Sequence, residues 1–243
     1  YTIYLSKGED PRPIFYLAKA YYDLRETKYD DRAIPLINQY LVGDHKSGWQ
    51  EERSQAWGYL GEIYRRKSQH NNSVKAFMNS LIEFPEFPDT YLQLAITYML
   101  KGMWERSLFW VRKASETPEL KTTLIKNPKD YQLRMMQVIY NCSLNLSKVD
   151  EAWAAAQKMY EIEPNDQSIK EAHSFIQNLV TQRNFTRTYV EIVDFLKKTE
   201  PSKIKPLLAS APQIIVNTPF IQDIYKKNMP PKFWEDNEVT FYC

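Results

Sequence analysis

The sequence predicts an all-α solenoid of antiparallel helix pairs, and three observations support this fold class. An aromatic residue, a leucine, a small residue and a tyrosine recur 34 residues apart, as Trp57-Leu60-Gly61-Tyr64 and as Tyr91-Leu94-Ala95-Tyr98. Their spacing of i, i+3, i+4 and i+7 places each set on one face of a helix. Only 6 glycines occur in the 243 residues, which suits a chain made mostly of helices.

The 34-residue period resembles that of the tetratricopeptide repeat (TPR), a pair of helices joined by a turn. Both registers continue through small, apolar and proline positions, at Ser73, Phe77, Ser80 and Pro85 and at Ser107, Val111, Ala114 and Pro118, the last one place early. Small residues at Gly61 and Ala95 are expected to let the paired helices approach closely. Stacked repeats of this kind bury their apolar faces against their neighbours.

Two further repeats flank this pair, so that TPR-like repeats are expected over residues 1–164. A weaker first repeat starts at Ile14, after two prolines, and is expected to turn over residues 25–31. A fourth unit has its first helix within 132–146 and its second after Asp150, which is expected to cap that helix. Insertions are expected near residues 42–50 and 119–129.

The remaining chain is expected to close the stack and lead into another domain. Two capping helices, near 166–182 and 186–198, are expected within residues 165–200, because a solenoid needs its open end covered. Prolines at 201, 206, 212, 219, 230 and 231 predict a connector of short helices over 201–237. Residues 238–243 are β-branched and aromatic, and predict the first strand of a truncated following domain.

Composition excludes several classes of partner. The chain has 26% charged residues and a formal net charge of +2, so it carries no overall bias toward nucleic acid. A helical-repeat reader of RNA would need a continuous basic groove, which Glu62 and Ile96 interrupt. No apolar stretch reaches the ~18 residues of a membrane span. Cys142 and Cys243 are too distant in sequence to indicate a disulfide framework, so a cytoplasmic setting is expected.

No catalytic, cofactor or metal site is predicted in this segment. The three histidines stand alone in sequence, without a neighbouring cysteine pair or a second histidine at metal-binding spacing. No glycine-rich phosphate loop occurs. The adjacent carboxylates Glu51-Glu52 and Asp30-Asp31 point in different directions on a helix or turn, so they are expected to cap helices or face solvent. Function is therefore expected to lie in a binding surface.

In TPR arrays the first helix of each pair lines a concave groove, at its second, fifth, ninth, twelfth and thirteenth positions. The residues expected to bind a partner there are Phe15, Lys19, Tyr22, Glu62, Arg65, Arg66, Leu92, Ile96, Met99, Leu100 and Asn141. The set from Glu62 to Arg66 is polar and suits a peptide backbone or carboxylates. The set from Leu92 to Leu100 is apolar, so something is expected to cover it.

Two alternatives for what occupies this groove are open. The groove docks an extended or helical segment of a partner, or it is filled by another domain or by the chain's own connector. The second alternative is favoured, because Ile214-Ile215-Val216 makes the connector apolar enough to fold back. The ninth positions, Lys19, Glu62, Ile96 and Asn141, differ from the lysine and asparagine clamp of chaperone-binding relatives. A receptor for chaperone tails is therefore not expected.

Both ends of the chain also resemble parts of glycosyltransferases. Residues 12–18 (RPIFYLA), residues 47–52 (SGWQEE) and the long loop before Tyr131 resemble the helical region that follows the catalytic domain of family-2 glycosyltransferases. Residues 230–234 and 239–243 look like the lead-in and first strand of a GT-B type domain. The resemblance implies a non-catalytic bridge that positions catalytic domains or acceptor, with the other domains of its own polypeptide as partners. The alternative is a freestanding TPR adaptor that binds a peptide or protein in its groove.

Overall fold

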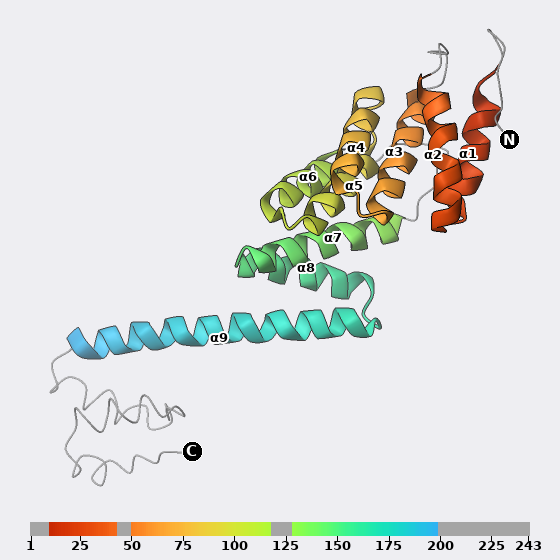
Figure 1. Cartoon of the computed structure of the whole chain (residues 1–243). Helices are drawn as coiled ribbons and strands as arrows, with labels where there is room; N and C mark the ends of the chain where they lie inside the picture. The colour runs from red at the N-terminus through yellow and green to blue at the C-terminus, as the bar shows by residue number, and fades with distance from the viewer. Residues whose placement is uncertain (1–9, 43–49, 118–127, 199–243) are drawn as a thin grey trace, which may run out of the picture. The chain divides into compact units, whose positions relative to one another are not determined.

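The computed structural model describes residues 10–42, 50–117 and 128–198, and every regular element in these ranges is an α-helix (Figure 1). The helices are α1 (Arg12–Asp23), α2 (Thr27–Val42), α3 (Gln50–Arg66), α4 (His70–Glu83), α5 (Pro88–Leu100), α6 (Trp104–Glu116), α7 (Pro128–Asn145), α8 (Val149–Ile162) and α9 (Gln167–Lys198). The predicted all-α solenoid is confirmed. The chain divides into two units, residues 1–180 and 181–243, and the packing described below lies within the first.

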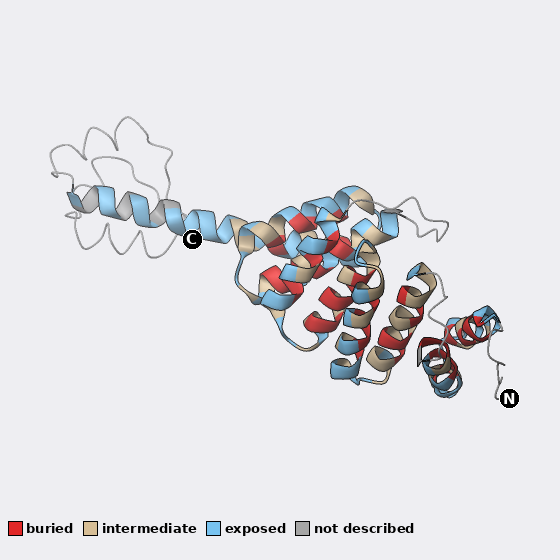
Figure 2. Ribbon diagram, turned by 90° about the horizontal axis from the view of Figure 1, so that it is seen from above, coloured by how far each residue is buried: buried red, intermediate tan, exposed pale blue. Residues whose placement is uncertain are grey.

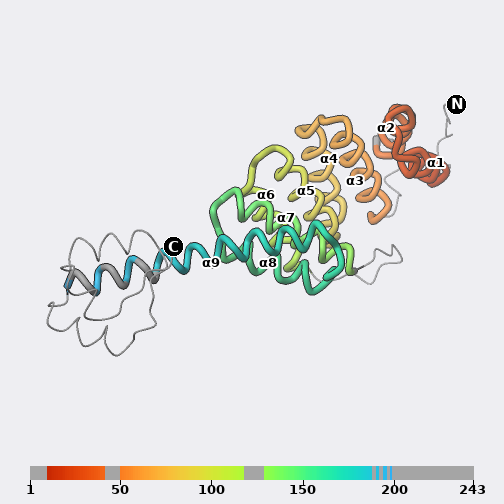
Figure 3. Tube along the Cα trace, turned by 90° about the horizontal axis from the view of Figure 1, so that it is seen from below, coloured from red at the N-terminus to blue at the C-terminus, as the bar shows by residue number. Residues whose placement is uncertain are grey.

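The first eight helices form four consecutive pairs, α1 with α2, α3 with α4, α5 with α6, and α7 with α8. Successive pairs stack, because the second helix of each pair also packs against the first helix of the next. The first helices α1, α3, α5 and α7 contact one another in that order (Figure 3). The insertions expected near residues 42–50 and 119–129 fall between α2 and α3 and between α6 and α7, where residues 43–49 and 118–127 lie outside the described ranges. Residues 128 and 129 already belong to α7.

A three-residue turn joins the helices of each described pair. Its middle residue has a positive φ each time: 53° at Arg25, 58° at Ser68, 69° at Gly102 and 57° at Ser147. The first turn therefore covers residues 24–26, and the longer turn expected over 25–31 is wrong, because α2 already begins at Thr27. Only one of these left-handed positions is a glycine, so the others accept a steric cost of about 1 kcal/mol or more.

Hydrogen bonds typical of a Schellman helix end close three of these turns. The third turn residue donates its N–H to a carbonyl five residues earlier, from Gln69 to Tyr64 at 2.8 Å and from Met103 to Tyr98 at 2.9 Å. Lys148 donates in the same way to Ser143 at 2.8 Å. These bonds satisfy carbonyls that the helix end would leave without partners.

Complementary side-chain sizes allow the two helices of a pair to approach. A Cβ added to Gly61 would lie 2.7 Å from the nearest ring carbon of Phe77, so the glycine is required for this contact. The fourth pair reverses the sizes, with Tyr140 on the first helix packed against Ala152 and Ala156 on the second. Figure 2 shows the buried residues along the faces where helices meet.

Polar contacts inside the stack also link neighbouring helices. The hydroxyl groups of Ser54 and Ser80 lie 2.8 Å apart, and Ser80 also lies 3.1 Å from the hydroxyl of Thr90, so that α3, α4 and α5 are joined. Arg53 donates two hydrogen bonds to the carboxylate of Glu83, at 3.1 and 2.7 Å. The three hydroxyl groups are buried, and buried polar groups stabilise a packed interior only when they are paired, as these are.

Helix α9 is one continuous helix of 32 residues, whereas the sequence predicts two. Residues 182–186, where a break is expected, contain neither proline nor glycine, so nothing in the backbone interrupts the helix. In the first unit, Ile169 and Ile176 of α9 are buried with residues of α7 and α8. Along the described residues no helix is both long and apolar enough to cross a membrane. The expected connector and terminal strand lie outside the described residues.

Candidate functional site

Three of the predicted groove residues belong to the core. The exposed fractions of Phe15, Tyr22 and Leu92 are 3%, 6% and 1%. Phe15 lies against the ring of Tyr59 on the next first helix, with ring centroids 6.0 Å apart. Leu92 is buried in a cluster that includes Val138 of α7. A partner on the surface does not reach these three side chains, because the first helix of the following pair covers them.

Two cationic residues of the predicted groove are paired within the chain. Arg66 donates hydrogen bonds to the carboxylate of Asp30, which is 1% exposed, and its guanidinium lies 5.1 Å from the ring centroid of Tyr22. Lys19 forms an ion pair with Asp23 at 2.5 Å on the same helix. The Arg66 contact joins α2 to α3, so this side chain stabilises the stack.

Arg65 links the first helices α3 and α5 and is paired with Glu62 on its own helix. Arg65 donates to the backbone carbonyl of Gln93 on α5 at 3.3 Å, and its guanidinium lies 3.8 Å from the carboxylate of Glu62. Burial lowers the pKa of Arg65. Burial, followed by the nearby charge of Glu62, raises the pKa of Tyr22. The polar set expected to bind peptide is therefore largely engaged between α1, α3 and α5.

Ile96, Met99 and Asn141 are brought together at a cleft of about 470 Å³. Helices α5, α7, α8 and the start of α9 line this cleft, with the residues Ile96, Met99, Arg134, Gln137, Val138, Tyr140, Asn141, Met159, Ser168, Ile169 and Ala172. Leu100 is 54% exposed and does not line the cleft. We refer to this site as the α5–α7–α9 cleft.

The α5–α7–α9 cleft combines an apolar lining with polar groups. Asn141 is exposed, and its side-chain amide donates to the carbonyl of Gln137 at 2.8 Å, which holds it along α7. The hydroxyl of Tyr140 donates to the carbonyl of Ala172 at 3.2 Å and so ties α7 to α9. Arg134 is the charged side chain of the lining, and it makes no hydrogen bond or ion pair with another described residue. These groups suit a ligand with both apolar and hydrogen-bonding parts.

Sequence reasoning missed the contribution of α9 to this cleft. Ser168, Ile169 and Ala172 were expected only to cap the stack, yet their helix supplies one wall. Ile169 and Ala172 are three residues apart and share a helix face, and this spacing is the feature of the sequence that could have predicted an apolar wall. The sequence of one helix does not specify which surface this face contacts, because the contact depends on how α7 and α8 pack.

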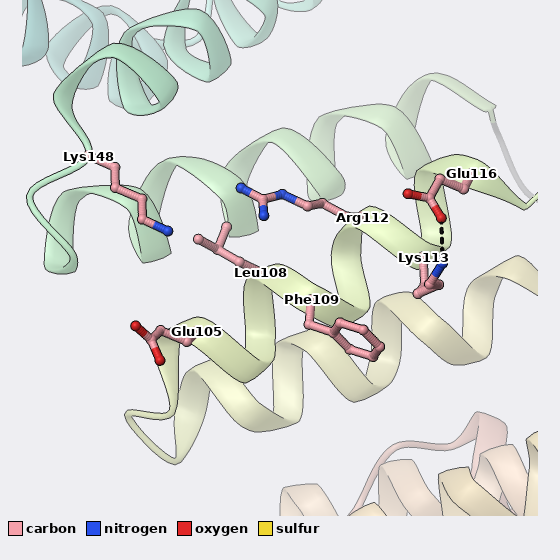
Figure 4. Close-up of a pocket in the computed structure, with 7 residues that line it drawn as sticks. All are labelled: Glu105, Leu108, Phe109, Arg112, Lys113, Glu116 and Lys148. Carbon is pink, nitrogen blue, oxygen red and sulfur yellow. Dashed lines mark hydrogen bonds and ion pairs between the residues drawn. The ribbon is translucent and has the colours of Figure 1, made fainter.

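A second, smaller cleft of about 360 Å³ lies beside α6 and the turn before α8 (Figure 4). Its lining includes the exposed ring of Phe109 and the cations of Arg112, Lys113 and Lys148. Two of these cations are already paired, Lys113 with Glu116 at 2.7 Å and Arg112 with Glu151 at 2.6 Å. Because these cations are already paired, the second cleft offers a ligand fewer available charges, and the α5–α7–α9 cleft is the stronger candidate for a binding site.

Within the described ranges, no group of three or more histidine, cysteine, aspartate or glutamate side chains is arranged to hold a metal ion. Cys142 is a free, buried thiol, and burial raises its pKa, which disfavours the reactive thiolate.

Comparisons with known proteins support the fold. No family model matches the chain, and no curated protein does. Among solved structures, it is similar to a putative kinesin light chain from Podospora anserina with nearly identical TPR-like repeats, at 15% identity and a TM-score of 0.53, over 79% of this chain and 97% of that one. It is also similar to MamA of AMB-1, at 16% identity and a TM-score of 0.51, over 80% of this chain and 97% of that one.

The Pseudomonas aeruginosa protein pilF matches at 12% identity and a TM-score of 0.54, over 70% of this chain and 68% of that one. These likenesses establish a TPR-like helical solenoid. At identities this low, they carry the fold and nothing about ligands.

Proposed function

We propose that this chain is a non-catalytic scaffold that binds an extended protein segment in the α5–α7–α9 cleft. The observation that carries the proposal is the coincidence at one site of an apolar lining, exposed amide groups and a guanidinium that has no ion-pair partner among the described residues. The predicted groove residues Ile96, Met99 and Asn141 meet there, whereas Phe15, Tyr22 and Leu92 support the stack from within. Repeat arrays provide such surfaces because their packing leaves one face of the first helices uncovered.

The size and chemistry of the cleft favour an extended segment. A cleft of about 470 Å³ is large enough for one or two side chains, and too small for a whole domain. An extended peptide directs alternate side chains to one side and presents backbone groups between them. The side-chain amides of Gln137 and Asn141 offer both donors and acceptors to that backbone.

The test compares two tryptophan substitutions one helical turn apart on α7. Asn141→Trp places a bulky ring in the cleft, while Asn145→Trp changes an exposed position that does not line it. The purified variants and the unchanged protein are applied to an array of defined synthetic peptides. We expect Asn141→Trp to lose the peptides that the unchanged protein binds, and Asn145→Trp to keep them. Equal binding by both variants would show that the cleft is not the ligand site.

A finer proposal places this scaffold inside a glycosyltransferase, as a bridge that positions catalytic domains or acceptor in the cytoplasm. The resemblance of residues 12–18 and 47–52 to the region after family-2 catalytic domains supports it, together with residues 230–243. The test is to sequence the parent reading frame on both sides. A sugar-nucleotide domain with an Asp-x-Asp motif before residue 1, or a GT-B domain after residue 243, is the expected result. Flanking sequences with neither domain would favour the freestanding adaptor.

A further inference from the structure

We infer that the α5–α7–α9 cleft selects segments of a partner protein in which an apolar side chain is adjacent to an acidic one. The inference rests on the proposed function and adds the chemical class of the ligand. It combines two features of the same lining, an apolar surface from several helices and one guanidinium. Each feature accounts for one half of the recognised pair.

The apolar half follows from the side chains that form the lining. Ile96 and Met99 of α5 are half-buried and pack against the core cluster of α5, α6 and α7, so one side of each is held in place. Val138, Met159 and Ile169 border the cleft from α7, α8 and α9, but each is only 3% exposed, so the half-buried Ile96 and Met99 present more of the apolar surface that a ligand can reach. An aliphatic side chain that enters this cleft removes apolar surface from water on both partners.

The acidic half follows from Arg134. Its guanidinium is exposed, lines the cleft and has no ion-pair partner among the residues that the structure describes. Arginine binds carboxylates with two parallel hydrogen bonds, which gives direction as well as attraction. A carboxylate that follows the apolar side chain along an extended segment would meet this group.

The charges around Arg134 agree with this assignment. The nearby carboxylates of Glu62 and Asp89 act on Arg65, and neither of them lines the cleft. The positive charge of Arg134 also contributes to the lowered pKa of Arg65, after the larger effect of burial. Two guanidinium groups therefore lie in one region, and a basic segment would add a third positive charge. Because the carboxylates of Glu62 and Asp89 already offset the charge of Arg65, Arg134 is the cation that attracts an acidic segment in the cleft.

The experiment uses labelled extended peptides in a glycine–serine background, with leucine and glutamate at adjacent positions. Matched probes replace the glutamate by glutamine or lysine, or the leucine by serine. Binding is followed by fluorescence anisotropy with the unchanged protein, with Arg134→Gln and with Arg106→Gln, a control at an exposed arginine of α6 outside the cleft. Thermal melts check that each variant is folded.

We expect the leucine–glutamate peptide to bind, and the peptide change to glutamine or the Arg134→Gln change to weaken it about tenfold, as for one charge-assisted hydrogen bond. The two changes together should weaken it no more than either alone, and Arg106→Gln should have no effect. Equal affinity for the glutamate and glutamine peptides overturns the inference. If lysine peptides bind as well as glutamate peptides and Asn141→Trp abolishes their binding, the acidic preference is wrong and the proposed function stands. If Asn141→Trp abolishes the binding of no peptide, the acidic preference and the proposed function are both wrong.

Discussion

Replacing Gly61 by alanine tests the close contact between α3 and α4 on which the helix pair depends. The new Cβ would lie 2.7 Å from one ring carbon of Phe77 and 2.8 Å from two others. Phe77 is 1% exposed and packed with Leu94 and Tyr98, so its ring has little room to move. Gly58, one turn earlier on the same helix, has no atom within 4 Å of an added Cβ and provides a matched control.

The two substitutions are expected to change the free energy of unfolding in opposite directions. Carbon atoms pack favourably at about 3.5–4.0 Å, so the Gly61→Ala contact must open by roughly 1 Å. Overpacking of this kind costs about 1–3 kcal/mol. Alanine recovers about 0.5–1 kcal/mol of helix propensity at either position. Gly61→Ala should therefore lose about 1–2 kcal/mol of unfolding free energy, while Gly58→Ala should gain about 0.5–1 kcal/mol.

Circular dichroism melts and urea titrations measure both effects. For a unit of this size, the loss at Gly61 corresponds to a fall in Tm of about 2–8 °C. A double-mutant cycle with Phe77→Leu adds a direct test, because the smaller side chain should relieve part of the clash that Gly61→Ala creates. A Tm for Gly61→Ala at or above that of Gly58→Ala would refute the close contact between Gly61 and Phe77.

Further predictions concern ion pairs and turns. Asp30→Asn should destabilise the stack by about 1–3 kcal/mol, because it weakens the hydrogen bonds of a buried carboxylate with Arg66. Asp31→Asn should cost under about 1 kcal/mol in the same urea titration, because Asp31 is exposed in its ion pair with Lys67. Hydrogen bonds from Arg53 lower the pKa of Glu83 from its ordinary 4.5. The ionised Glu83 stabilises the fold above that pH, and this stabilisation is lost as the pH falls through the lowered pKa. The urea midpoint of the unchanged protein should therefore fall with pH below about pH 4.5, and that of Glu83→Gln should fall less. Ser147→Gly should raise and Gly102→Ala lower the unfolding free energy by about 1 kcal/mol each, since both positions have positive φ. Unchanged midpoints would contradict the assigned turn geometry.

The repeat register made most of the fold predictable. Gly61 and Ala95 marked the sites of close helix approach, and Ser68 and Gly102, which are 34 positions apart, occupy the same place in successive turns. The first turn was predicted too long, since the predicted turn over 25–31 included Asp30. In the structure it is buried in α2 and paired, which is a tertiary contact that local sequence does not reveal.

The candidate site was predictable only in part. Repeat positions identified Ile96, Met99 and Asn141, because these positions share a face of the first helices. They do not specify which of these side chains the next helix covers, and so Leu92 proved to be buried beneath α7. The wall that includes Ile169 depends on how α9 meets α7 and α8, which the stacking of several helices decides together.

The most direct test of the central claim is site-specific photo-cross-linking to a peptide selected on the array. A benzoylphenylalanine residue is introduced at Asn141 in the α5–α7–α9 cleft or, in a separate variant, at Phe109 in the second cleft (Figure 4). We predict a cross-linked adduct from position 141 that an excess of unlabelled peptide abolishes, and none from position 109. An adduct from position 109 alone would contradict the account and place the ligand on the other side of the repeat.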